Sequence, residues 1–118
     1  IGCTGIMVSN HGGRQLDGSR SPFDQLQEIV DAVGDKIDVI CEGGFQRGTH
    51  MLKALSIGAK ACSGGRLYLY ALAAAGQAGV ERALGQYKAE LERDMKLMGC
   101  KKISDLNRNN LRFRKVWI

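Results

Sequence analysis

Hydrophobic residues along this chain form short continuous runs that alternate with helical patterns. Three apolar runs, at residues 4–9, 37–41 and 59–63, have the length and composition of strands that are buried on both faces of a parallel sheet. Each run ends in polar residues or glycine, and apolar residues at helical spacing follow it. Three successive strand–helix units predict an α/β fold with a parallel sheet.

The helix limits are marked by capping residues and glycines. A serine–proline pair predicts the start of a first helix over 21–34, and Gly58 is expected to end the second. A third helical pattern is interrupted at 76–79 and resumes as a longer helix that Gly99 ends. Beyond it we expect a tail over 99–118 with a short helix around 104–106.

Composition is that of an ordinary soluble α/β domain, with 44% hydrophobic and 25% charged residues. The net charge is +5, and no nucleic-acid-binding motif accompanies it, so we interpret the basic tail as a solvated face and expect no nucleic-acid partner. No apolar run is long enough to span a membrane. The expected location is the cytoplasm or the inner face of a membrane. The basic residues in question are Lys101, Lys102, Arg108, Arg112, Arg114 and Lys115.

The four cysteines show no spacing typical of a metal site, either among themselves or with His11 and His50. We therefore predict reduced, structural cysteines and no metal ion. His50 lies within the second predicted helix, and we interpret it as structural. The cysteines are Cys3, Cys41, Cys62 and Cys100.

The segment SNHGGRQLD at 9–17 follows the first predicted strand and joins two reactive groups. The pKa of an ordinary histidine lies near neutrality, so His11 can accept and return a proton. The planar guanidinium of Arg14 matches a carboxylate with two parallel hydrogen bonds. Gly12 and Gly13 allow the backbone to turn between them.

Glycine pairs also follow the other two strands, in Glu42-Gly43-Gly44 and Gly64-Gly65-Arg66. The carboxyl ends of parallel strands meet at one edge of the sheet, and phosphate groups commonly bind between such loops. We expect the exposed main-chain N–H groups there to bind a phosphate.

These motifs together resemble the FMN-dependent alpha-hydroxy-acid dehydrogenase and oxidase family, which includes flavin-type lactate dehydrogenase, glycolate oxidase and mandelate dehydrogenase. The resemblance continues through EGGFQRGT at 42–49 and LKAL at 52–55 and covers nearly the whole chain. It implies a (β/α)8 barrel, of which these would be the last three units. With 118 residues against roughly 250 for a barrel, we expect residues 1–118 to be the carboxyl-terminal part of one barrel domain.

The resemblance further implies FMN as cofactor and oxidation of a small, lactate-like L-2-hydroxy acid to the 2-oxo acid. His11 would be the base and would contact the substrate, and Arg14 would bind its carboxylate. Glu42 stands where the family usually has Asp, and Gln46 where it usually has Arg, so the phosphate bond expected there is lost or passes to Arg47 or Arg66. The expected FMN-binding residues are Glu42, Gly43, Gly44, Phe45, Gln46, Gly65 and Arg66.

As partners, the resemblance implies an electron acceptor (oxygen, a quinone or a cytochrome) and a homo-oligomer for the full-length protein. Other active-site side chains would come from earlier strands, so we expect the isolated 118-residue chain to be inactive. Two alternatives stay open. One is another FMN barrel, such as a type 2 isopentenyl-diphosphate isomerase, which has similar glycine motifs but no use for His11 and Arg14. The other is a non-catalytic module that binds phosphate or FMN, or another protein.

Overall fold

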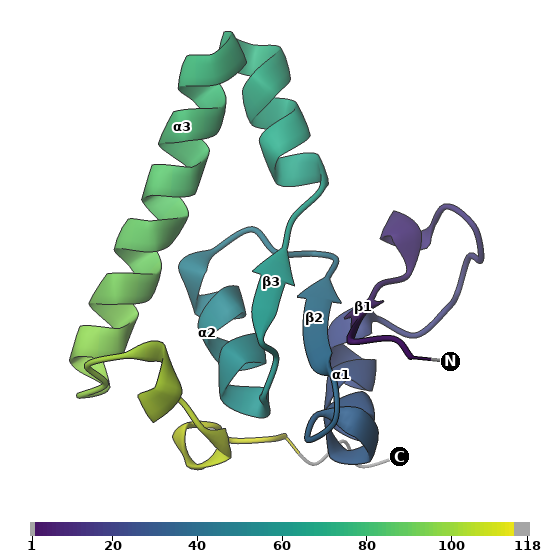
Figure 1. Cartoon of the computed structure of the whole chain (residues 1–118). Coiled ribbons are helices and arrows are strands. Elements are labelled where there is room, and N and C mark those ends of the chain that lie inside the picture. Colours follow the sequence, from purple (N-terminus) through teal and green to yellow (C-terminus); the bar gives the residue numbers. More distant parts are fainter. Residues whose placement is uncertain (1, 115–118) are drawn as a thin grey trace.

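The structure, a computed structural model, describes residues 2–114 and contains the parallel sheet that the sequence predicts. Its strands are β1 (Gly5–Val8), β2 (Asp38–Glu42) and β3 (Ala61–Ser63), in the order β1-β2-β3 (Figure 1). The strand limits lie within two residues of the predicted runs. The α/β prediction is therefore confirmed.

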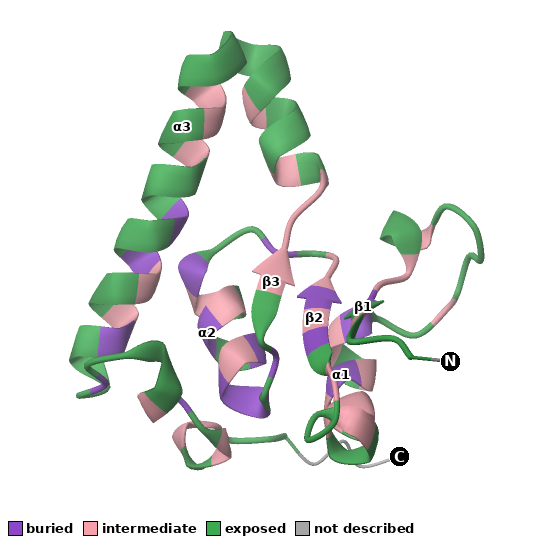
Figure 2. Cartoon of the chain, in the orientation of Figure 1, coloured by how far each residue is buried: buried purple, intermediate pink, exposed green. Residues whose placement is uncertain are grey.

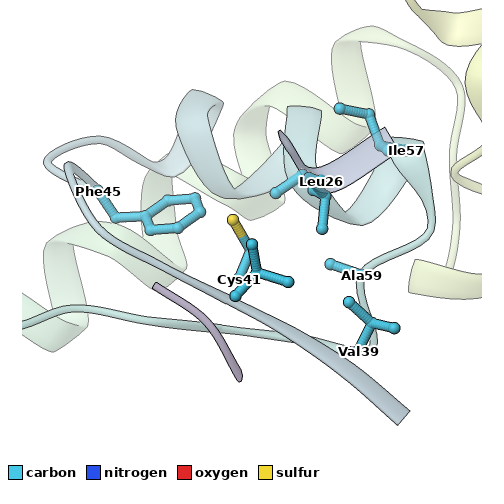
Figure 3. Close-up of a cluster of buried hydrophobic side chains, with 8 residues drawn as sticks. Leu26, Val39, Cys41, Phe45, Ile57 and Ala59 are labelled. Carbon is cyan, nitrogen blue, oxygen red and sulfur yellow. The ribbon is translucent and has the colours of Figure 1, made fainter. Parts of the chain in front are cut away.

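Helices α1 (Pro22–Val33) and α2 (Gly48–Ile57) pack on the sheet and form the main core with it. The Ser21 hydroxyl accepts a hydrogen bond from the Asp24 N–H at 3.2 Å, which confirms the predicted cap of α1. Figure 3 shows Leu26 of α1 and Ile57 of α2 against side chains of β2. On β1, Val8 points into this core, whereas Met7, on the other face of the strand, is 53% exposed.

Helix α3 (Arg66–Leu97) is a hairpin of two arms, which meet at a break at Ala75 and Gly76 (Figure 1). The predicted interruption is confirmed, but it is narrower than 76–79 because Gly79 already lies in the second arm. A Cβ on Gly79 would lie 2.1 Å from the carbonyl oxygen of Ala71 in the first arm. Glycine at this position therefore permits the close approach of the arms. Figure 2 shows that the buried residues of α3 lie on the second arm.

The segment after Gly99 packs on the helices through two short 3-10 helices, η2 (Ile103–Asp105) and η3 (Arg108–Asn110). The short helix predicted near 104–106 is confirmed. Arg108 donates to the Ile57 carbonyl at 3.0 Å and pairs with Asp31 at 2.6 Å, so this member of the basic group is structural rather than simply solvated. Lys115 lies outside the described residues. Within residues 2–114, no helix is sufficiently long and apolar to cross a membrane.

Candidate active site

Three loops at the carboxyl edge of the sheet come together, as the sequence predicts. The Ser9 hydroxyl, after β1, donates a hydrogen bond to Glu42 Oε2 at the end of β2. Arg66, after β3, donates from Nη2 to the Gly12 carbonyl oxygen at 2.8 Å. The other Glu42 oxygen, Oε1, lies 3.6 Å from the position that a Cβ on Gly65 would take. The loops that follow all three strands therefore meet at this edge of the sheet, through contacts of Ser9, Glu42 and Arg66.

The loop after β1 contains the 3-10 helix η1 (His11–Gly13), followed by Arg14 as its C-cap. His11 and Arg14 are both exposed, and they lie within one turn of each other. Among residues 2–114, the Arg14 guanidinium makes no ion pair. It is therefore available to a small anion at this edge of the sheet.

The loop between β2 and α2 is fixed by the second arm of α3. Glu90, only 4% exposed, accepts hydrogen bonds from the Gly48 N–H at 2.8 Å and from Arg47 Nε at 2.9 Å. The Arg47 guanidinium and then the Gly48 N–H lower the pKa of Glu90 from 4.5 to about 2. Arg47 is thus engaged by a protein carboxylate, which leaves Arg66 as the better of the two expected substitutes for a phosphate-binding arginine at position 46.

Phe45, one of the expected FMN-binding residues, has its side chain turned into the protein. It is buried in the main core (Figure 3), and its carbonyl oxygen accepts a hydrogen bond from the buried Tyr87 hydroxyl at 2.9 Å. Its large apolar ring is more stable in the core than in a polar loop, so Phe45 can offer a ligand only its main-chain N–H. The neighbouring Gln46 is exposed, and its N–H donates to His50 Nδ1 at 3.3 Å, in agreement with a structural role for His50.

The loop between β3 and α3 is more open. Gly65 is the N-cap of α3 and provides no side-chain hydrogen bond to the first turn. Apart from Gly64 itself and its two chain neighbours, no heavy atom of the described residues lies within 4 Å of where a Cβ on Gly64 would be. The exposed Arg66 guanidinium uses one of several N–H donors on Gly12. This junction can therefore still bind an anion.

Sequence reasoning missed Glu90, and it placed Tyr87 on the apolar face of its predicted helix without its contact to the loop about forty residues earlier. Both are buried in the second arm, and a buried carboxylate such as that of Glu90 has no signature in a single sequence. Cys41 and Cys100 are buried, as expected for structural thiols, whereas Cys3 is exposed. Burial raises the pKa of Cys41 to about 11. Within residues 2–114, no cluster of His, Cys, Asp and Glu could hold a metal ion.

Comparison with known proteins identifies the class of protein that this site belongs to. Residues 1–113 match the family model of the FMN-dependent dehydrogenases. The chain is therefore a member of the FMN-dependent alpha-hydroxy-acid dehydrogenase and oxidase family.

Particular relatives carry both oxidase and dehydrogenase names. The chain is 47% identical to a peroxisomal (S)-2-hydroxyacid oxidase of Arabidopsis thaliana over 111 residues, 94% of this chain and 31% of the relative. It is 48% identical to an L-lactate oxidase of Nostoc sp. over 106 residues, 90% of this chain and 29% of the relative. The chain spans about three tenths of the length of these curated relatives.

Solved structures confirm the fold assignment. A soluble mutant of the membrane-associated (S)-mandelate dehydrogenase from Pseudomonas putida superposes with a TM-score of 0.89 at 41% identity, covering 94% of this chain and 31% of that one. A flavocytochrome b2 mutant superposes with a TM-score of 0.85 at 43% identity, covering 90% of this chain and 29% of that one. The three strands and their helices match part of the barrel of FMN-dependent dehydrogenases.

Proposed function

We propose that this chain belongs to an FMN-dependent enzyme that converts a small, lactate-like L-2-hydroxy acid to the 2-oxo acid. The chain would supply the base, the arginine that binds the substrate carboxylate and part of the FMN site. The observation that carries the proposal is the contact between the His11 loop and Arg66, with Nη2 2.8 Å from the Gly12 carbonyl oxygen. This contact joins the loop that contains the candidate base to a candidate cofactor-binding arginine. The (S)-2-hydroxyacid and L-lactate oxidases among the relatives support the substrate class.

Three features of this edge of the sheet support FMN as the cofactor. Helix α3 begins without a side-chain cap, and a helix N-terminus with unsatisfied N–H groups attracts a phosphate. Arg66 adds a charge-assisted donor beside it. Gly44, with φ of 74°, has open space around its Cβ position, so a ligand can approach its backbone closely.

We infer that FMN is held chiefly through the start of α3, and that the β2 loop supplies the remaining contacts. Glu42 Oε1 faces the Gly65 side of the site and can accept a hydrogen bond from a hydroxyl of the cofactor. Gln46 is uncharged, so the phosphate loses one expected ion pair. The proposed FMN-binding residues are Glu42, Gly43, Gly44, Phe45 through its main chain, Gln46, Gly65 and Arg66.

The chain's own residues bind the substrate and move its proton. Arg14 forms two parallel hydrogen bonds to the substrate carboxylate, which positions the alpha carbon. His11 accepts a proton from the substrate as the alpha carbon loses two electrons. When bound, FMN would accept these two electrons together with the second hydrogen that the substrate loses. The product is a 2-oxo acid, and His11 then returns its proton to solvent or to the cofactor side of the site.

Electron transfer to a second acceptor completes the cycle. The names of the relatives include oxidases and a cytochrome-linked L-lactate dehydrogenase of Wickerhamomyces anomalus, so we propose oxygen or a cytochrome as acceptor. We also propose that the full-length protein is a homo-oligomer, and that residues 1–118 belong to one barrel domain whose other strands complete the site. The 118-residue chain by itself should then be inactive.

Anaerobic titration of the purified full-length protein with L-lactate tests this proposal. We expect a yellow protein whose flavin absorbance is bleached by L-lactate, glycolate or (S)-mandelate, while D-lactate, the mirror-image control, has no effect. A protein that binds FMN but is reduced by none of these acids would favour the non-catalytic FMN-binding alternative. A protein that binds no FMN would contradict the proposal altogether.

A further inference from the structure

The loop after β1 holds His11 in a backbone conformation that histidine rarely adopts. The φ of His11 is 55°, and those of Gly12 and Gly13 are 71° and 75°. Three consecutive residues thus lie in the left-handed region, which is unfavourable for a residue with a side chain. Such a conformation persists only where neighbouring groups hold it. The contacts of this loop therefore fix the position of the His11 Cα, and with it the direction in which the His11 side chain leaves the main chain.

The Ser9 hydroxyl makes a direct contact with the His11 main chain. Its oxygen accepts a hydrogen bond from the His11 N–H at 2.9 Å, and its proton is donated to Glu42 Oε2. A serine hydroxyl has one proton, so donation to the carboxylate turns the oxygen lone pairs toward His11. Glu42 thus acts on the His11 backbone through Ser9.

The strands place these two residues side by side. Val8 of β1 pairs with Cys41 of β2, so Ser9 and Glu42 are the next residues along the two neighbouring strands. The Glu42 carboxylate also reaches toward Gly65 with its second oxygen. It therefore lies between the His11 loop and the start of α3, where we place the cofactor.

We propose that Ser9 is a positioning residue for the base of the reaction and that it transmits a constraint from Glu42 to the His11 main chain. This inference rests on the proposed function of His11. Ser9 needs no contact with the substrate. Since a displaced base raises the reaction barrier even when the substrate binds normally, loss of Ser9 should lower the rate of flavin reduction more than it lowers the affinity for substrate or FMN.

Single-turnover flavin reduction in the full-length holoenzyme measures this difference. We expect Ser9→Ala to lower the limiting reduction rate at least about tenfold, with the dissociation constants of FMN and oxalate within about threefold of the parent. Ser9→Thr keeps the hydroxyl and should recover most of the rate. Ser19→Ala is the matched control, because Ser19 takes no part in this network, and it should reduce at the parent rate.

Hydrogen–deuterium exchange of the peptide over 9–14 tests the same contact without turnover. Ser9→Ala should speed exchange of the His11 amide at least about tenfold because that amide loses its acceptor, whereas Ser19→Ala should not. Unchanged exchange in Ser9→Ala, or a rate loss matched by an equal loss of FMN affinity, would overturn the positioning role. Failure of the parent to oxidise any 2-hydroxy acid would instead refute the proposed function, and the exchange result would still show whether Ser9 holds the His11 main chain.

Discussion

Helices α2 and α3 begin at the same edge of the sheet, each after a strand and a glycine pair, yet their first turns have opposite surroundings. The first turn of α2 has an internal anion, because Glu90 accepts the Gly48 N–H at 2.8 Å. The first turn of α3 has no side-chain cap, and Arg66 stands beside it. The N-terminus of a helix attracts negative charge. One junction is thus completed by the protein itself, and the other can be completed by a ligand phosphate.

This difference assigns separate roles to the two arginines nearby. Arg47 lies three residues after its glycine pair and Arg66 directly after its own, and the sequence alone allows either arginine to bind a phosphate. In the structure, Arg47 pairs with Glu90 at 2.9 Å. The Gly12 carbonyl accepts from only one of the several N–H donors of Arg66.

The largest effect should come from Gly48→Ala, which forces the start of α2 away from the second arm of α3. A Cβ on Gly48 would lie 2.5 Å from the Leu91 nitrogen and 2.6 Å from the Glu90 Cβ, and main-chain atoms of α3 have little room to move. We expect a loss of about 2–3 kcal/mol in the free energy of unfolding.

Gly85→Ala is its control, because Gly85 lies in the same α3 arm with nothing within 4 Å of its Cβ position. This variant should gain roughly 0.5–1 kcal/mol from helix propensity. Urea unfolding of the full-length protein measures both variants. Equal stability of the two would show that α2 and α3 do not touch at Gly48.

The next largest effect concerns the start of α3, where we expect the phosphate of FMN to bind. Arg66→Ala should raise the dissociation constant of FMN tenfold or more, since a charge-assisted hydrogen bond typically contributes about 1.5–3 kcal/mol. Arg47→Ala removes the same charge from the neighbouring loop and should change FMN affinity by less than about threefold. Fluorescence titration of the apoprotein with FMN compares them. A larger loss of FMN affinity in Arg47→Ala than in Arg66→Ala would show that Arg47, and not Arg66, is the phosphate-binding arginine.

The smallest effect is a pH dependence of stability in Glu90→Gln. The pKa of Glu90 is about 2 in the folded protein, below its ordinary 4.5, so its contribution is present above pH 4.5 and is lost as the pH falls toward 2. Glu90→Gln should lower the melting temperature by a few degrees at pH 7, and the difference from the parent should shrink below pH 4.5.

Glu92→Gln provides the comparison for this measurement, because Glu92 is an exposed carboxylate two residues further along α3. Its melting temperature should stay close to the parent value at every pH. A Glu90→Gln difference that is the same at pH 7 and pH 3.5 would show that the Glu90 carboxylate is not the anion that caps α2.

Much of this architecture could be predicted from local patterns in the sequence. The three strands, the Ser21 cap and the break near Gly76 each follow from residues that are adjacent in the chain. The loop of SNHGGRQLD could also be placed at a strand end, because that requires only the order of an apolar run and a glycine turn.

The sequence could not predict that the start of α2 is capped by the protein while the start of α3 is left open to a ligand. This difference depends on Glu90 and Tyr87, which reach the β2 loop from a distant helix. A glutamate on a helix usually faces solvent, so nothing in its local sequence shows that it is buried. A motif position likewise does not show whether a side chain or only its main chain faces a ligand, and the Phe45 side chain is buried in the core.

The most direct test of the account is the rate of flavin reduction by L-lactate in His11→Gln, measured by anaerobic stopped flow in the full-length protein. Glutamine keeps a polar side chain of similar reach but cannot accept the proton at neutral pH. We expect the rate to fall at least about a hundredfold, while the carboxylate inhibitor oxalate still binds. In the companion variant Arg14→Lys, which loses the planar fork, oxalate affinity and rate should fall together. A His11→Gln protein that reduces its flavin at close to the parent rate would contradict the assignment of His11 as the base.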